Sequence, residues 1–239
     1  MKIAMAKYLS ETKMLDYSAD SIRELVQKRR WREKDEYLRI KEIYDFVRNE
    51  ILFGYNVADD IPASRVLSDG YGQCNTKGTL FMALLRASGV LCRFHGFTIG
   101  KQLQKGAMTG IVYKRAPDHI LHSWVEVFYK DKWYNLEGYI LDEKYLKKLQ
   151  AANRCEGAFC GYGVAVKNFE NPVIEWNGND TYIQSEGITY DFGVFDSPDA
   201  FFERYTQDLS RLKAFLYRCY GRRAMNRNVK KIRKYGKKN

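Results

Sequence analysis

The sequence predicts an α+β domain, because its helical and strand patterns fall in separate blocks of the chain. Apolar residues at helical spacing fill residues 16–51 and residues 75–88. Strand patterns then dominate residues 90–136, and the turn Lys130-Asp131 separates the last two of them. Strands joined by a short turn pair antiparallel, so we expect an antiparallel sheet with helices packed beside it.

The helix over residues 75–88 is the strongest element of the prediction. Its apolar residues cover most faces of the helix, which indicates a central, buried position. Gly89 follows, at the position where a left-handed residue ends many helices. Two earlier helices are expected, over residues 16–31 with Ser18 or Asp20 as the N-cap, and over residues 35–51.

The remaining segments divide into strands, loops and further helices. Short apolar runs predict strands, and clusters of Gly, Pro, Asn and Asp predict loops. The expected strands cover residues 51–57, 90–99, 120–129, 133–136, 173–176 and 181–184, the last two around the turn Asn177-Gly178. The expected loops cover residues 59–64, 68–72, 100–110 and 154–167, and the further helices cover residues 143–151 and 200–220.

The formal net charge of +11 over 239 residues is concentrated at the C-terminus. Residues 211–239 contain twelve Lys and Arg but no Asp or Glu, which leaves 28 basic and 29 acidic residues in residues 1–210. A near-neutral body excludes a protein that wraps nucleic acid over its whole surface. We predict one domain over residues 1–200, followed by a C-terminal helix and basic tail over residues 201–239. Beyond Gly221 this tail is expected either to be a solvated terminus or to bind an acidic partner, such as nucleic acid, anionic lipid or an acidic protein.

The sequence predicts a cytoplasmic protein that is not integral to a membrane. Lys7 interrupts the first apolar run after four residues, and no segment approaches the 18 apolar residues of a membrane span. An odd number of cysteines, five, favours reduced thiols. Cys155 and Cys160 have no histidine near them in sequence, so we expect two buried thiols there rather than a zinc site. We expect neither a metal nor a cofactor.

Cys74 occupies a position that suits a reactive thiol. It follows the glycine-containing turn over residues 69–73 and opens the central helix. The glycines allow a tight turn and the close approach of a ligand. The partial positive charge and free N–H groups of a helix N-terminus favour a thiolate, which is the nucleophilic form, and can donate to an oxyanion. The alternative is a small structural residue at the start of the helix.

His122 lies in the strand expected over residues 120–129 and is the candidate base. If the hairpin turns at its Lys-Asp dipeptide, His122 pairs with Tyr139 and Trp124 pairs with Glu137. Glu137 then lies diagonal to His122 on one face, where a carboxylate can orient the imidazole. A slip of one residue would move Glu137 to the other face. Asn135 has the same parity and is the second candidate for this role.

Three motifs, in this order, resemble the transglutaminase-like superfamily. Gly72-Gln73-Cys74 and the helix that follows resemble its nucleophile motif, while residues 122–127 and 133–137 resemble its histidine strand and the next strand. The separation of 48 residues between Cys74 and His122 is within what the family allows. The resemblance covers about residues 41–138. The family usually has Asp where this chain has Glu137, whose side chain is one methylene longer.

The resemblance implies a papain-like core and acyl transfer at an amide bond. Cys74 would attack the carbonyl to form a thioester, His122 would act as base and then as acid, and Glu137 would orient His122. The Cys74 backbone N–H is the expected oxyanion donor, with Gln73 and Tyr55 as candidates for a second donor. The expected partner is a protein, peptide or small amide substrate, and the enzyme is either a peptidase, amidase or deamidase, or a transglutaminase.

Two questions stay open at this point. The loop over residues 100–117 either lines the cleft or is a solvated connector. The alternative function is a non-enzymatic scaffold that binds an acidic partner through the basic tail.

Overall fold

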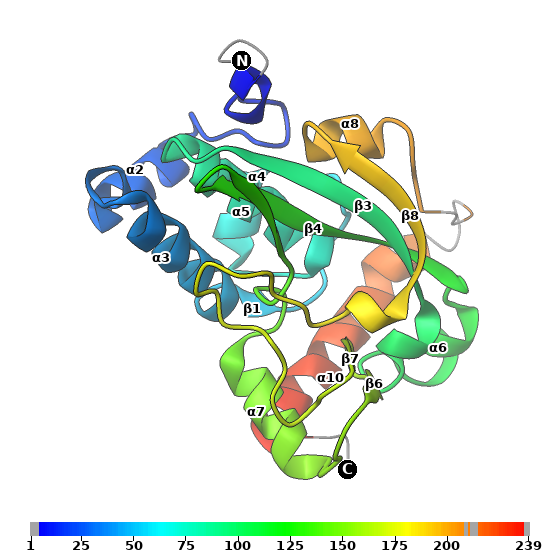
Figure 1. The fold of residues 1–239 in the computed structure, drawn as a ribbon. Coiled ribbons are helices and arrows are strands. Elements are labelled where there is room, and N and C mark those ends of the chain that lie inside the picture. Colours follow the sequence, from blue (N-terminus) through cyan, green and yellow to red (C-terminus); the bar gives the residue numbers. More distant parts are fainter. Residues whose placement is uncertain (1–4, 208–209, 211–214, 237–239) are drawn as a thin grey trace.

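A four-stranded antiparallel sheet forms the centre of the computed structural model, which describes residues 5–207, 210 and 215–236 (Figure 1). The helices pack around this sheet and do not alternate regularly with its strands, so the α+β prediction is confirmed. The strands lie in the order β5 (Lys132–Leu136), β4 (His119–Tyr129), β3 (Cys92–Gly100) and β8 (Ile188–Phe195).

The helix α5 (Cys74–Ala87) packs against β3 and β4, behind the sheet in the view of Figure 1. Every one of its residues is buried, as predicted. Gln73 caps the helix reciprocally: its side-chain oxygen accepts from the amide of Thr76, and the Thr76 hydroxyl accepts from the amide of Gln73. Gly89, at φ +82°, ends the helix, and the next amide returns to the carbonyl of Leu85.

Two predicted helices on the N-terminal side of α5 are confirmed with shifted ends. The first, α2 (Asp20–Arg29), begins after Ala19, and no side chain caps it, so the prediction of a Ser18 or Asp20 cap is wrong. The second, α3 (Glu36–Asn49), begins after Asp35, whose side chain accepts from the amide of Leu38.

Helix α4 (Ala63–Asp69) was not predicted, and it overlaps the end of the loop expected over residues 59–64 and the start of the one expected over residues 68–72. Pro62 immediately precedes it, and a proline there is compatible with a helix because the first amides of a helix have no intrahelical acceptor. The chain on either side of α4 forms a short parallel pair, β1 (Leu52–Phe53) with β2 (Tyr71–Gly72). The strand predicted over residues 51–57 is therefore reduced to β1.

The second half of the chain departs further from the prediction. Helix α7 (Glu143–Ala152) is confirmed. The loop predicted over residues 154–167 contains a hairpin, and residues 173–176 and 181–184 form no regular strand, although Thr181 makes an isolated bridge to Leu136. The elements outside the sheet include β6 (Phe159–Gly161), β7 (Val164–Val166), α6 (Gly110–Arg115), η1 (Ala6–Tyr8), η2 (Trp31–Glu33), η3 (Lys101–Gln104) and η4 (Ser185–Gly187).

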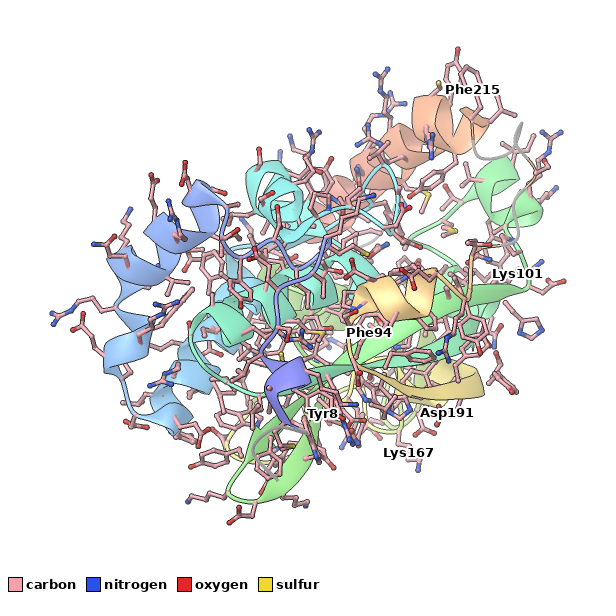
Figure 2. All side chains as sticks on the ribbon, turned by 90° about the horizontal axis from the view of Figure 1, so that it is seen from above. Tyr8, Phe94, Lys101, Lys167, Asp191 and Phe215 are labelled. Carbon is pink, nitrogen blue, oxygen red and sulfur yellow. The ribbon has the colours of Figure 1, made fainter. Side chains whose placement is uncertain are left out.

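The helix predicted over residues 200–220 is not continuous. Helix α8 (Pro198–Phe202) ends early, residues 208–209 and 211–214 lie outside the described part, and a π-helical turn η5 (Tyr217–Gly221) leads into α10 (Arg222–Tyr235). Figure 2 shows Phe215 projecting outward from the start of this last helical segment.

Helix α10 is a docked part of the body, and it packs against α7 (Figure 1). It buries Met225, Val229 and Ile232, which share one face of the helix at i, i+4 and i+7. Arg233 also forms a half-buried ion pair with Asp142 at 2.7 Å. The prediction of a solvated terminus beyond Gly221 is therefore wrong for residues 222–235. The three apolar side chains pack this helix against the body, although its other face is basic.

All five cysteines are free, but Cys160 is exposed and Cys155 is only half-buried, so the prediction of two buried thiols is wrong. Within the described residues, no helix is long and apolar enough to cross a membrane. No three His, Cys, Asp or Glu side chains converge on a metal position in that same part of the chain.

Candidate active site

In the turn before α5, the backbone lies very close to the first residues of the helix. Gly70 ends α4 with φ +68°, and the chain then passes through β2 to Cys74. A Cβ on Gly72 would lie 2.7 Å from Oγ1 of Thr76 and 2.9 Å from Cγ of Lys77. Only glycine therefore fits at position 72, and this close approach sets Cys74 at the first position of α5 with 7% of its surface exposed.

His122 and Glu137 meet as predicted. The imidazole Nε2 lies 2.7 Å from Oε1 of Glu137, and both side chains are completely buried. The other carboxylate oxygen, Oε2, accepts from the amides of Ile183 (2.8 Å) and Gln184 (2.9 Å). The carboxylate is thus held from both sides, so it can fix the orientation of the imidazole.

The hairpin has the predicted register but a shorter ladder. Lys130 and Asp131 both have positive φ, and Val125 pairs with Leu136, where the ladder ends. The predicted pairs of His122 with Tyr139 and of Trp124 with Glu137 therefore do not form. Glu137 instead bonds to Thr181 through its amide, and its side chain reaches His122 from just beyond the strand.

Asn135, the second candidate, does not contact His122. It lies opposite Glu126 in the hairpin, and its Nδ2 donates to the hydroxyl of Tyr182 at 2.9 Å. Among the two candidates, the structure thus brings only Glu137 to the imidazole.

The electrostatics of His122 favour the imidazolium. Burial alone would lower its pKa, but the adjacent Cys74 sulfur and the Glu137 carboxylate overcome this effect and raise the pKa from 6.5 to about 10. The Nδ1 atom is buried and has no regular hydrogen bond, while it remains close enough to Cys74 for the sulfur to act on the ring. Catalytic hydrogen bonds are often poorly aligned before substrate binds. One ring nitrogen is therefore oriented and the other is available to the thiol.

Asn75 ties the cysteine helix to the histidine strand, a contact that the sequence analysis missed. Its Oδ1 accepts from the hydroxyl of Ser123 at 2.9 Å and from the Cys74 thiol at a sulfur–oxygen distance of 3.7 Å. Its Nδ2 donates to the carbonyl of Leu121 at 3.2 Å. The only signal in the sequence is that Asn75 and Ser123 are the neighbours of the two predicted site residues.

The candidate oxyanion donors differ in whether their N–H or O–H groups already donate to another acceptor. The amide of Cys74 lies in the first turn of α5, where no intrahelical acceptor exists. The Gln73 side chain already has partners, because its oxygen caps α5 and its NH₂ group donates to Asp59. The Tyr55 hydroxyl donates to Gln104 at 2.6 Å. The Cys74 amide is thus the donor that remains available.

A cavity of about 670 Å³ opens onto Cys74. The loop over residues 100–117 lines it through Met108 and α6, so this loop is part of the cleft and not a detached connector. Asp59 also faces the cavity, and burial raises the pKa of its carboxyl to about 6 although hydrogen bonds from Asn75 and Gln73 act in the opposite direction.

The other two histidines lie away from this cavity. His95 bridges Glu126 (2.6 Å) and Asp191 (2.8 Å) on the sheet, in a half-buried position. His119 is exposed and bonds to Thr189.

A family model described as the transglutaminase-like superfamily matches residues 23–138. Residues 23–138, just under half of the chain, thus match the core of the transglutaminase-like superfamily. The match contains Cys74, His122 and Glu137, and it begins earlier than the resemblance seen in the motifs, so that it includes most of α2 and all of α3. This match supports a cysteine-dependent enzyme in general.

One of the similar chains among the solved structures comes from Cytophaga hutchinsonii and is described as a candidate cysteine protease, with a TM-score of 0.47 and 12% sequence identity. The similarity covers 82% of this chain and 48% of that chain, so this chain spans about half the length of the other. No curated protein matches the sequence.

Proposed function

We propose that this protein hydrolyses amide bonds through a thioester on Cys74, with His122 as base and acid and Glu137 as its orienting residue. The observation that carries the proposal is the buried imidazole. One nitrogen is bonded to a carboxylate held by two backbone amides, and the other has no regular partner beside Cys74. An imidazole with one oriented and one free nitrogen beside a thiol has the geometry that nucleophilic catalysis requires.

The steps follow from the positions of these groups. His122 holds the proton of the Cys74 thiol, and the thiolate attacks the carbonyl carbon of the amide. The amide of Cys74 donates to the oxygen on which negative charge develops. The C–N bond then breaks, the proton on His122 goes to the departing amine, and a thioester remains. Water adds to the thioester with His122 as base, so that the acid is released and the thiol is restored.

Mass spectrometry of a mixed incubation tests this reaction. A peptide mixture with side-chain carboxamides and a primary amine is incubated with the protein, or with the Cys74→Ala variant. Cleavage, loss of ammonia and incorporation of the amine have different mass signatures. We expect cleavage or deamidation that requires Cys74. Incorporation of the amine would instead make the protein a transglutaminase, and equal product from Cys74→Ala would contradict a thioester route.

A second candidate function, binding of an acidic partner, rests on the exposed face of α10. Arg222, Arg223, Arg227 and Lys230 line a groove of about 680 Å³ together with two tyrosines. Among the described basic residues of α10, only Arg233 has an acidic partner. Unpaired cations beside aromatic rings suit a polyanion.

Charge reversal on α10 tests this second function without removing the helix. The variant Arg223→Glu/Lys230→Glu changes two exposed residues, and Lys28→Glu/Lys144→Glu is a matched control on exposed, unpaired lysines elsewhere. We expect salt-dependent binding of a DNA duplex or of anionic vesicles that the first variant loses and the control keeps. Equal binding by both variants would reject the α10 face as the binding site.

A further inference from the structure

The cavity beside Cys74 has a composition that the proposed chemistry alone does not explain. Besides residues 73–75, its wall is built by residues from the segments 55–60, 99–121, 202–207 and 216–225, and the last two of these lie outside the transglutaminase-like match. Cys74 is the one thiol that lines it. A side chain placed into this cavity would therefore stand next to the proposed nucleophile.

Most of the wall is apolar. It includes Val57, Met108, Ile111, Val112, Phe202, Leu216 and Met225. Ile111, Leu216 and Tyr220 are also exposed, with 62%, 37% and 71% of their surface accessible. Exposed apolar side chains that gather around one cavity mark a binding surface, because water covers them only at a cost.

Polar side chains line the cavity beside the nucleophile and also elsewhere. Residues 73–75 line it at the start of α5, and Asp59 is hydrogen-bonded to Gln73 there. Further polar side chains, such as Arg115 and Arg218, come from the other lining segments. A few polar groups in a mostly apolar chamber orient a ligand, while the apolar wall accounts for its affinity.

We propose that this cavity binds a bulky apolar group attached to the scissile amide, so that the preferred substrates are amides of hydrophobic or aromatic compounds. The proposal rests on the proposed function for the role of Cys74. The volume of about 670 Å³ falls within the range of sites that enclose whole small molecules. A glutamine carboxamide alone would occupy only the end near Cys74 and leave most of the apolar wall in contact with water.

Two alkylating reagents with the same reactive group and different amide substituents test this preference. N-(2-phenylethyl)-2-chloroacetamide and N-(2-hydroxyethyl)-2-chloroacetamide react in the same way: the Cys74 sulfur attacks the carbon that bears chlorine, an S–C bond forms, and chloride leaves. Rates at Cys74 are measured by peptide mass spectrometry and divided by the rates with glutathione. We expect the phenylethyl reagent to react at least about tenfold faster and to show saturation, as a bound aromatic group adds affinity.

A matched pair of variants locates the preference. Ile111→Asp places a charge on the cavity wall, and Val173→Asp places one on a similarly exposed apolar residue (59% accessible) outside the cavity. We expect Ile111→Asp to reduce the preference for the phenylethyl reagent at least threefold and Val173→Asp to leave it unchanged. Equal normalised rates for the two reagents in the unmodified protein, or a preference that Ile111→Asp does not alter, would overturn the proposal.

The same assay separates this proposal from the proposed function. If His122→Ala leaves the rate with the hydroxyethyl reagent unchanged, the catalytic role of His122 fails, whatever the preference between reagents. If His122→Ala slows both reagents but the two react equally in the unmodified protein, the chemistry stands and the apolar substrate class fails.

Discussion

Replacement of Glu137 by Gln removes one charge and preserves the shape of the side chain. The carboxylate now takes part in three hydrogen bonds, with Nε2 of His122 at 2.7 Å and with the amides of Ile183 and Gln184 at 2.8 and 2.9 Å. A glutamine has only one oxygen. If that oxygen stays with the two amides, the NH₂ group faces Nε2 and forces the His122 proton onto Nδ1, where it can no longer accept the thiol proton.

The expected effects on activity and stability differ in size. A reversed tautomer in a serine protease triad lowers kcat by about 10⁴-fold, and we expect a loss of that order here. A hydrogen bond to a charged group contributes about 1.5–3 kcal/mol and one between neutral groups about 0.5–1.5 kcal/mol. Three bonds that each weaken by roughly 1 kcal/mol lower the free energy of unfolding by about 3 kcal/mol. For a chain of this length the melting temperature falls by about 6 to 12 °C.

Glu126→Gln is the matched control for this prediction. Glu126 is a buried carboxylate on β4 that contacts a different histidine, His95, at 2.6 Å and Arg93 at 2.6 Å. Urea unfolding measures stability, and the rate of Cys74 alkylation measures its reactivity in both variants. Both variants should lose stability, and only Glu137→Gln should lower the rate of Cys74 alkylation. If Glu137→Gln leaves the Cys74 rate unchanged, Glu137 is a structural residue and the orienting role is refuted.

Three further predictions concern stability. Because the pKa of His122 is raised to about 10, this residue contributes fully to the free energy of unfolding below about pH 6.5, and the contribution disappears as the pH rises through about 10. The urea concentration at the unfolding midpoint should therefore fall over that interval, and His122→Ala should make it depend less on pH. Arg233→Met should cost about 3–5 kcal/mol in urea titrations, because it leaves Asp142 without its cation; an unchanged midpoint would contradict the docking of α10. Gly138→Ala should cost about 1–3 kcal/mol by thermal unfolding, since a Cβ would lie 2.4 Å from the Tyr44 hydroxyl and 2.8 Å from the backbone of Ile174; full stability would show that the backbone relaxes there.

The parts of the fold that were predicted from the sequence are those with strong local patterns. The apolar faces of α5 and the strand pattern of β4 are local properties, and so is the turn at Lys130-Asp131 that sets the register. Short elements were missed, because α4 and the β6–β7 hairpin depend on burial by distant segments. The packing of α10 was not predicted, because its many basic residues obscured the three apolar residues on one face that determine where it packs.

The candidate site was predicted where adjacent elements bring its residues together. Cys74 and Glu137 were found because a helix start and a hairpin register are local features. The support of Glu137 by Ile183 and Gln184 was not foreseen, since that segment is irregular and 46 and 47 residues away in sequence. The apolar wall from residues 202–207 and 216–225 was also missed, because no local pattern indicates which segment returns to cover a cavity.

The most direct test of the proposed nucleophile compares cysteines within one molecule. Iodoacetamide alkylation at pH 6, resolved by peptide mass spectrometry, gives separate rates for Cys74, for exposed Cys160, and for Cys92, which stays unlabelled only while the protein is folded. An imidazolium that holds Cys74 as a thiolate predicts that Cys74 reacts at least about ten times faster than Cys160, despite its burial, and that His122→Ala removes this difference while Cys92 stays protected. A Cys74 rate no greater than that of Cys160, or one that His122→Ala does not change, would contradict the central claim.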